Sequence, residues 1–290
     1  MKTYNIGKTG IIPFAYFGGV QRLVGSTFLR VDRLCENDSS FEKWIHGKKY
    51  DNLIFQKAYW TEMMKMFDGP MILDICDPDW IQEQLDIVEI GNMVHAITCS
   101  SMELTTLMRT YFPNKLVEYI PDRLDFSVYP QAKEKHVQKA KNVVWFGFIN
   151  NAHETLEQML PVIKEYDLHL RIIADKTYSK EDGIFELKPE YFFYRPNTVY
   201  EQLKEADIVL NPKSNRAFYK YKSNNKSLIA WKLGLPVAHT NEELVRFIDP
   251  DERNREVVEK QSLLDQEYQI QKSVEQYKDI IQKIRFQYFH

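Results

Sequence analysis

Residues 207–240 read DIVLNPKSNRAFYKYKSNNKSLIAWKLGLPVAHT, and this stretch decides the fold and the candidate site. A short apolar run is followed by a loop rich in Lys and Asn, then by an amphipathic segment and the sequence Gly-Leu-Pro-Val. No Asp or Glu stands between Asp207 and Glu242. The span instead holds six basic residues: Lys213, Arg216, Lys220, Lys222, Lys226 and Lys232.

A basic loop that leads into a helix predicts a binding site for an anion. The first turn of a helix offers free N–H groups and the positive end of the helix dipole, and both favour negative charge. The other interpretation of the loop is a solvated basic face. In a chain whose net charge is −3, the local excess of positive charge favours the anion site.

Composition and length limit the class of protein. The chain has 290 residues, of which 44% are hydrophobic and 27% charged, as expected for a soluble globular protein with one large or two ordinary domains. We find no apolar run of the roughly 20 residues that cross a bilayer and no secretory signal. The three cysteines lack metal-type spacing, so we expect reduced thiols and a cytoplasmic protein. The near-neutral charge disfavours broad binding to nucleic acid.

The second half of the chain alternates apolar strands with helices of about ten residues. This alternation predicts a parallel, doubly wound sheet. Strands are expected at 142–148, 168–174, 191–194, 207–210 and 236–239, and helices at 153–166, 198–206, 225–233 and 241–248.

The first half shows the same alternation less clearly, and its first 45 residues resist assignment. The polar stretch 129–140 separates the halves. The fold class is therefore α/β, with two Rossmann-like doubly wound domains that face each other across a cleft. Strands are expected at 52–58, 71–76, 95–99 and 116–120, and helices at 60–67, 101–111 and 263–289.

Several motifs resemble those of nucleotide-sugar glycosyltransferases with the GT-B fold, in particular the family 4-like members. In the second half these are the strand–Gly–loop of 142–150, the turn, helix and strand of 192–212, and GLPVAHT at 234–240. In the first half they are LDICD at 73–77, HAITCSS at 95–101 and YIPDRLD at 119–125. The resemblance implies an N-terminal acceptor-side domain (1–135), a nucleotide-sugar-binding domain (141–262) and a terminal helix (263–290) that packs back on the first domain.

The resemblance implies transfer of a sugar from a nucleotide diphosphate sugar to an acceptor hydroxyl. The nucleotide sugar is a substrate, and we expect no cofactor and no obligatory metal, because ammonium groups and N–H dipoles can stabilise the leaving diphosphate. The acceptor stays open between a saccharide, a small molecule, a protein and a modified DNA base. The residues expected to bind the donor are Gly147, Asn150, Tyr194, Arg195, Lys213, Lys222, Ser223, Asn225, Lys226 and, from the first domain, Arg30.

The first candidate for a catalytic base is Asp77, at the end of the LDICD strand, and the second is Asp74. For Asp77 the other interpretation is an N-cap of the following turn. For Arg30 it is a surface salt bridge.

The chain departs from the family 4 pattern at one place. Many members carry two glutamates before the Gly-x-Pro motif, and those positions hold Tyr221 and Ile229 here. The absence of these glutamates leaves the identity of the sugar and the stereochemistry of transfer open. It also leaves open an alternative function, that of a non-catalytic nucleotide-sugar-binding protein. A second alternative is a glycosyltransferase that acts on modified bases in DNA. The basic residues expected to follow a DNA phosphate backbone are Arg22, Arg30, Arg33, Lys48 and Lys49.

Overall fold

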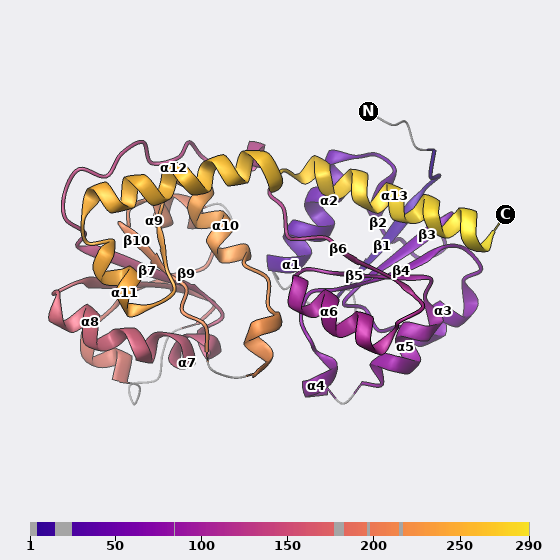
Figure 1. The fold of residues 1–290 in the computed structure, drawn as a ribbon, viewed down its shortest axis with the longest axis horizontal. Helices are drawn as coiled ribbons and strands as arrows, with labels where there is room; N and C mark the ends of the chain where they lie inside the picture. The colour runs from indigo at the N-terminus through magenta and orange to yellow at the C-terminus, as the bar shows by residue number, and fades with distance from the viewer. Residues whose placement is uncertain are drawn as a thin grey trace. The chain divides into compact units, whose positions relative to one another are not determined.

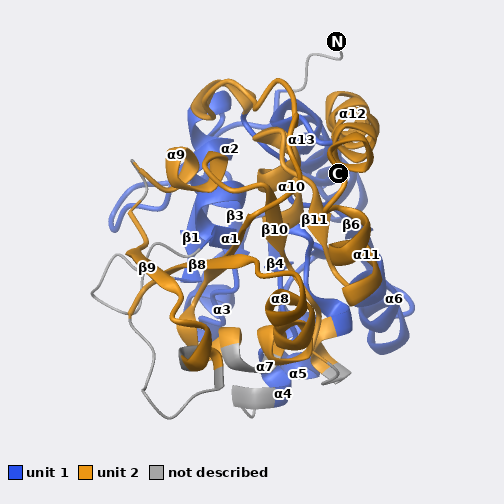
Figure 2. Ribbon diagram, turned by 90° about the vertical axis from the view of Figure 1, so that its left-hand side faces the viewer, with its two compact units in different colours: residues 1–125, 220–225, 268–290 blue, residues 126–219, 226–267 orange. Residues whose placement is uncertain are grey.

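The computed structural model describes residues 5–14, 25–83, 85–176, 183–195, 198–214 and 217–289. The chain divides into two compact units (Figure 2). The first unit comprises Met1–Asp125, Lys220–Asn225 and Tyr268–His290, and the second comprises Phe126–Tyr219 and Lys226–Glu267. Arg22 and Arg216 lie outside the described residues.

The first unit is built on a six-stranded sheet in which every pair of neighbours is parallel. Its central strands are buried on both faces, which explains their continuous apolar runs. In spatial order the strands are β2 (Phe41–Lys43), β1 (Thr9–Pro13), β3 (Asn52–Gln56), β4 (Met71–Ile75), β5 (Ala96–Cys99) and β6 (Leu116–Tyr119).

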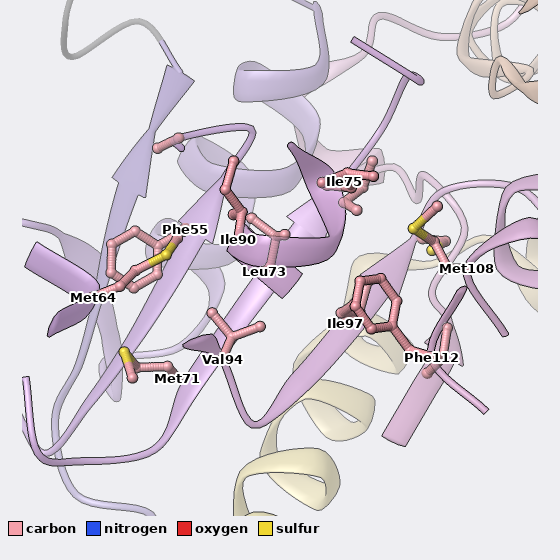
Figure 3. Packing of buried hydrophobic residues seen from close by; sticks show 14 of the residues in the cluster. Phe55, Met64, Met71, Leu73, Ile75, Ile90, Val94, Ile97, Met108 and Phe112 are labelled. Carbon is pink, nitrogen blue, oxygen red and sulfur yellow. The ribbon is translucent and has the colours of Figure 1, made fainter. Parts of the chain in front are cut away.

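Helices cover both faces of this sheet (Figure 1). On one face, apolar side chains of β3, β4 and β5 form a core with those of α3, α5 and α6 (Figure 3). On the other face lie α2 and the C-terminal helix α13. A π-helical turn at Phe28–Asp32 leads directly into α2. The helices are α1 (Gly25–Thr27), α2 (Arg33–Asn37), α3 (Thr61–Met66), α4 (Trp80–Glu83), α5 (Ile87–Met93), α6 (Met102–Tyr111) and α13 (Ile270–Tyr288).

The second unit is built on a five-stranded parallel sheet. Figure 1 shows α7, α8 and α11 on one side of it and α9, α10 and α12 on the other. The strands in spatial order are β11 (Val237–Ala238), β10 (Ile208–Leu210), β7 (Asn142–Gly147), β8 (His169–Ala174) and β9 (Glu190–Phe193). The helices are α7 (Ala152–Leu156), α8 (Leu160–Glu165), α9 (Val199–Lys204), α10 (Asn225–Lys232), α11 (Asn241–Arg246) and α12 (Pro250–Glu267).

Both strand orders place a topological switch point in the sheet. The second sheet runs outward from β7 through β8 to β9 and then returns to the other side of β7 with β10. In the first sheet, β2 pairs with one side of β1 and the chain then continues with β3 on the other side of β1, so the switch point lies between β1 and β3. Ligands of open parallel sheets bind at such points, beyond the carboxyl ends of the strands.

The predicted fold class is confirmed, with two doubly wound parallel sheets, and the C-terminal helix α13 packs on α2 of the first unit. The expected single helix at 263–289 is wrong, because two helices, α12 and α13, occupy the region. Between them the backbone pairs with Leu124, whose N–H donates to Tyr268 O and whose carbonyl accepts from Ile270 N–H. These bonds take the place of a continuous helical ladder.

None of the helices within the described ranges is long and apolar enough to cross a membrane.

Candidate functional site

Lys226 and Gly147 meet at the carboxyl end of β7, the strand at the switch point of the second sheet. Lys226 stands in the first turn of α10, and its ammonium lies 4.4 Å from the centre of the Trp145 ring. A Cβ placed on Gly147 would lie 2.6 Å from the Lys226 Nζ atom. Two of the predicted donor-binding residues are therefore brought together.

A glycine is favoured at position 147 for two independent reasons. Its φ is +147°, in a region that other residues enter only with strain. It also has no side chain to displace the Lys226 ammonium. The glycine therefore lets a cation approach the strand end where a sheet ligand is expected.

The loop after β7 is fixed by the strand beside it. Ile149 N–H donates to the Asp175 carboxylate at 2.8 Å, and Asp175 follows the carboxyl end of β8. The Tyr219 hydroxyl donates to Asn151 Oδ1 at 3.3 Å. Asn150, predicted to bind the donor, is exposed between them.

Tyr194 and Arg195 follow β9 at the same edge of the second sheet. Tyr194 N–H donates to Ala174 O at 2.8 Å, which continues the strand pairing. Burial, and then the neighbouring Tyr200, raises the pKa of Tyr194 to about 12. Arg195 is exposed, and its carbonyl accepts from Val199 N–H at the start of α9.

A polar cluster that the sequence analysis missed lies where β10 and β11 end. The Asn211 amide donates to Ser227 Oγ at 3.1 Å, and the His239 Nδ1–H donates to Asn211 O at 2.9 Å. His239 Nε2 lies 3.5 Å from Ser227 Oγ, which buries the serine of α10 against both strands. Lys213, also predicted to bind the donor, is exposed in the same loop. In the sequence, the polar residues that follow these two apolar strands, in Asn-Pro and Val-Ala-His, could have indicated this cluster.

Arg30 and Asp74 form a buried ion pair in the first unit. The two guanidinium N–H groups donate to both Asp74 oxygens at 2.8 and 2.6 Å, and Thr98 donates to the same carboxylate at 2.7 Å. Arg30 is 5% exposed, so a surface salt bridge is excluded. Burial opposes the charge of Arg30, but the Asp74 carboxylate holds its pKa above the usual value. Both oxygens of Asp74 thus accept hydrogen bonds within the unit, and Asp77 remains the first candidate for the base.

Asp77 pairs with a lysine that the sequence analysis did not single out. Lys57 follows β3 at the switch point of the first sheet, and its ammonium lies 2.7 Å from Asp77 and 3.1 Å from Asp79. Burial would lower the pKa of Lys57, but these two carboxylates raise it above its usual value. Lys57 also has φ +50°, an uncommon backbone conformation for a residue other than glycine. Asp77 therefore lies just after the carboxyl end of β4, near the switch point of the first sheet, where its carboxylate pairs with Lys57.

Lys222, Ser223 and Asn225 lie in the first unit, although their neighbours in the chain belong to the second. The Ser223 hydroxyl donates to Asp122 at 2.6 Å. The predicted donor-binding residues are thus divided: Arg30, Lys222, Ser223 and Asn225 in the first unit, and Gly147, Asn150, Tyr194, Arg195, Lys213 and Lys226 in the second.

Across the described residues, no group of three or more His, Cys, Asp or Glu side chains has the geometry to hold a metal ion. Cys35, Cys76 and Cys99 are free thiols.

Solved structures with the same fold include several glycosyltransferase-related proteins. HepE from Anabaena, in complex with UDP-glucose, matches with a TM-score of 0.67 over 96% of this chain and 99% of its own, at 10% identity. TarM matches with a TM-score of 0.59 over 79% of this chain and 54% of its own, at 13% identity. The pneumococcal O-GlcNAc transferase GtfA, in complex with UDP and GlcNAc, matches with a TM-score of 0.52 over 80% of this chain and 56% of its own, at 8% identity.

These similarities show that the chain has the GT-B fold of nucleotide-sugar glycosyltransferases. No protein-family model matches the sequence, and no curated protein matches it. The structural similarity at such low identity establishes the fold, and the chemistry must be argued from the residues.

Proposed function

We propose that this protein is a glycosyltransferase that binds a nucleotide diphosphate sugar on its second unit and transfers the sugar to an acceptor hydroxyl. The observation that carries the proposal is the Lys226 ammonium beside Gly147 at the switch point of the second sheet. A fold shared with HepE, which was solved in complex with UDP-glucose, supports the same substrate class.

In the proposed reaction, the bond between the anomeric carbon and the diphosphate breaks and negative charge grows on the departing phosphate oxygens. The Lys226 ammonium and the N–H groups of the first turn of α10 are positive groups in fixed positions, so they stabilise that charge without rearrangement. Ser227, on the same turn, is held by Asn211 and His239. This bonding fixes the first turn of α10 relative to the strand ends.

The nucleoside is assigned to the edge where β9 ends. The Tyr194 side chain is half-buried and Arg195 is exposed beside it, which gives a base an aromatic surface and a cation. On the first unit, we assign Asp77 as the group that accepts the proton of the acceptor hydroxyl. The Lys57 ammonium, 2.7 Å away, holds that carboxylate in place.

Calorimetric titration tests the donor site. We expect UDP or GDP, and one of their sugar conjugates, to bind the wild type, and Lys226→Met to raise the Kd by at least about tenfold, equivalent to about 1.4 kcal/mol. Lys164→Met is the matched control, because Lys164 is an exposed lysine of the same unit. Equal Kd values for the wild type and Lys226→Met would refute the site, and binding in EDTA tests the expected independence from metal.

A non-catalytic nucleotide-sugar-binding protein is the second candidate. It is favoured by Tyr221 and Ile229 at positions where many family 4 members carry glutamates, and Tyr221 packs against the apolar core of the first unit. Mass spectrometry separates the two functions. Acceptor-dependent release of free nucleotide diphosphate together with a glycosylated product supports transfer, whereas donor binding without either product supports the second candidate.

The structure weakens the alternative function, a glycosyltransferase that acts on modified bases in DNA, because several of the basic residues expected to contact DNA are buried or paired. Arg30 is buried, Arg33 pairs with Glu36 at 2.7 Å, and Lys48 pairs with Glu42 at 2.5 Å. These bonds leave fewer cations for a phosphate backbone. If the protein binds duplex DNA with an affinity that falls steeply as the salt concentration rises, DNA would again be a candidate acceptor.

A further inference from the structure

The segment 220–225 belongs to the first unit, while the residues on both sides of it belong to the second. The chain therefore leaves the second unit after Tyr219 and returns to it at Lys226, within the first turn of α10. Such an excursion needs anchors, because residues 221–225 are only half-buried and most of them are polar, so the segment has little apolar surface to hold it in place.

Two hydrogen bonds anchor the segment to strand ends of the first unit. The Ser101 hydroxyl, which also caps α6 by accepting from Leu104 N–H, donates to Tyr221 O at 2.7 Å. The Ser223 hydroxyl donates to Asp122 Oδ2 at 2.6 Å. The Tyr221 side chain adds apolar contact with the core of the unit.

Asp122 is an unusual anchor, because its carboxylate is buried. It follows β6 and is 1% exposed, and its other oxygen accepts from Arg30 at 3.1 Å. A buried carboxylate is costly unless its oxygens are bonded. Ser223 therefore completes the solvation of Asp122, and its short hydrogen bond to a carboxylate belongs to the strong class. Burial raises the pKa of Asp122, while Arg30 and Ser223 act in the opposite direction.

We propose that Asp122 is a positioning residue that holds segment 220–225 on the first unit through Ser223 and so fixes the point at which α10 begins. The segment carries Lys222 and runs directly into Lys226. The anchor itself is independent of any ligand, and only its consequence for donor binding rests on the proposed function.

Hydrogen exchange tests the anchor without reference to activity. We compare the wild type with Ser223→Ala, which removes the donor, and with Ser223→Thr, which keeps it. Amides of 220–226 should exchange at least about tenfold faster in Ser223→Ala and at nearly the wild-type rate in Ser223→Thr. Ser262→Ala is the control, because Ser262 is exposed on α12. Unchanged exchange in Ser223→Ala would overturn the proposal.

The consequence for the donor is measured on the same variants. We expect Ser223→Ala to raise the Kd or KM of the donor by about tenfold with a smaller change in kcat, and Ser223→Thr to restore the wild-type value. Faster exchange with an unchanged donor Kd would overturn the positioning role and leave only a structural anchor. If the wild type binds no nucleotide sugar at all, the proposed function fails, while the exchange result still decides the anchor.

Discussion

His136 makes the second unit sensitive to mild acid. It stands in the stretch 129–140, is 3% exposed, and its Nε2–H donates to Gly234 O at 3.0 Å. The Nδ1 atom is buried without a hydrogen-bond partner among the described residues. A second proton would therefore enter at Nδ1, where none of the described groups accepts a hydrogen bond from it.

The size of the effect follows from the pKa of His136. Burial, with help from Lys133 and Arg253, lowers this pKa from 6.5 to about 4. The folded state then binds its proton less readily than the unfolded state. The stability is fully present above about pH 6.5 and is lost as the pH falls toward 4. A shift of this size corresponds to about 3 kcal/mol between pH 7 and pH 4.

Urea unfolding between pH 4 and pH 7 checks this prediction. In His136→Gln the free energy of unfolding should depend less on pH than in the wild type, by about 3 kcal/mol over that range. The readout is the difference in pH dependence, so a general loss of stability in the variant does not affect it. His169→Gln, at an exposed histidine, should leave the pH dependence as it is in the wild type. Parallel curves for the wild type and His136→Gln would refute the reasoning.

Two further predictions concern the site and its support. Gly147→Ala places a Cβ 2.6 Å from the Lys226 ammonium at φ +147°, so we expect a loss of about 1–3 kcal/mol in stability and a donor Kd raised by at least about tenfold. Thermal unfolding and calorimetry measure both, and an unaltered Tm and Kd would contradict the role of this glycine. Arg30→Met leaves the Asp74 and Asp122 carboxylates buried without their cation, which should cost about 3–5 kcal/mol in urea unfolding. Arg255→Met is the control, because the Arg255 side chain is 71% exposed, and it should change the free energy of unfolding by less than about 0.5 kcal/mol. Equal effects of the two substitutions would argue against the buried network.

The secondary structure of the second half could be predicted because its signals are local. Strands buried on both faces are continuous apolar runs, and β7 and β8 were expected within one residue of their observed ends. The first 45 residues gave no such signal. Strands β1 and β2 and helix α2 were unassigned there, because β2 has only three residues and a π-helical turn precedes α2.

The stretch 129–140, whose polar composition predicts a separation of the halves, makes contacts that composition does not indicate. Lys133 N–H donates to Leu233 O, and Asn254 bonds both the N–H and the carbonyl of His136. Gly234, with φ +77°, gives room for the Lys133 backbone. Composition does not reveal such backbone contacts, because they depend on which surface the stretch meets.

The sequence by itself determined the parallel α/β character of both halves and a cation-rich segment before α10, because these properties are encoded in periodicity and in local charge. The tertiary structure alone decided where the cations go. Lys226 lies beside Gly147, 79 positions earlier in numbering, whereas Ser223 bonds Asp122 in the first unit at a separation of 101 residues. Contacts across such separations leave no pattern in one sequence, since they are set by strand order and by the closing of long loops.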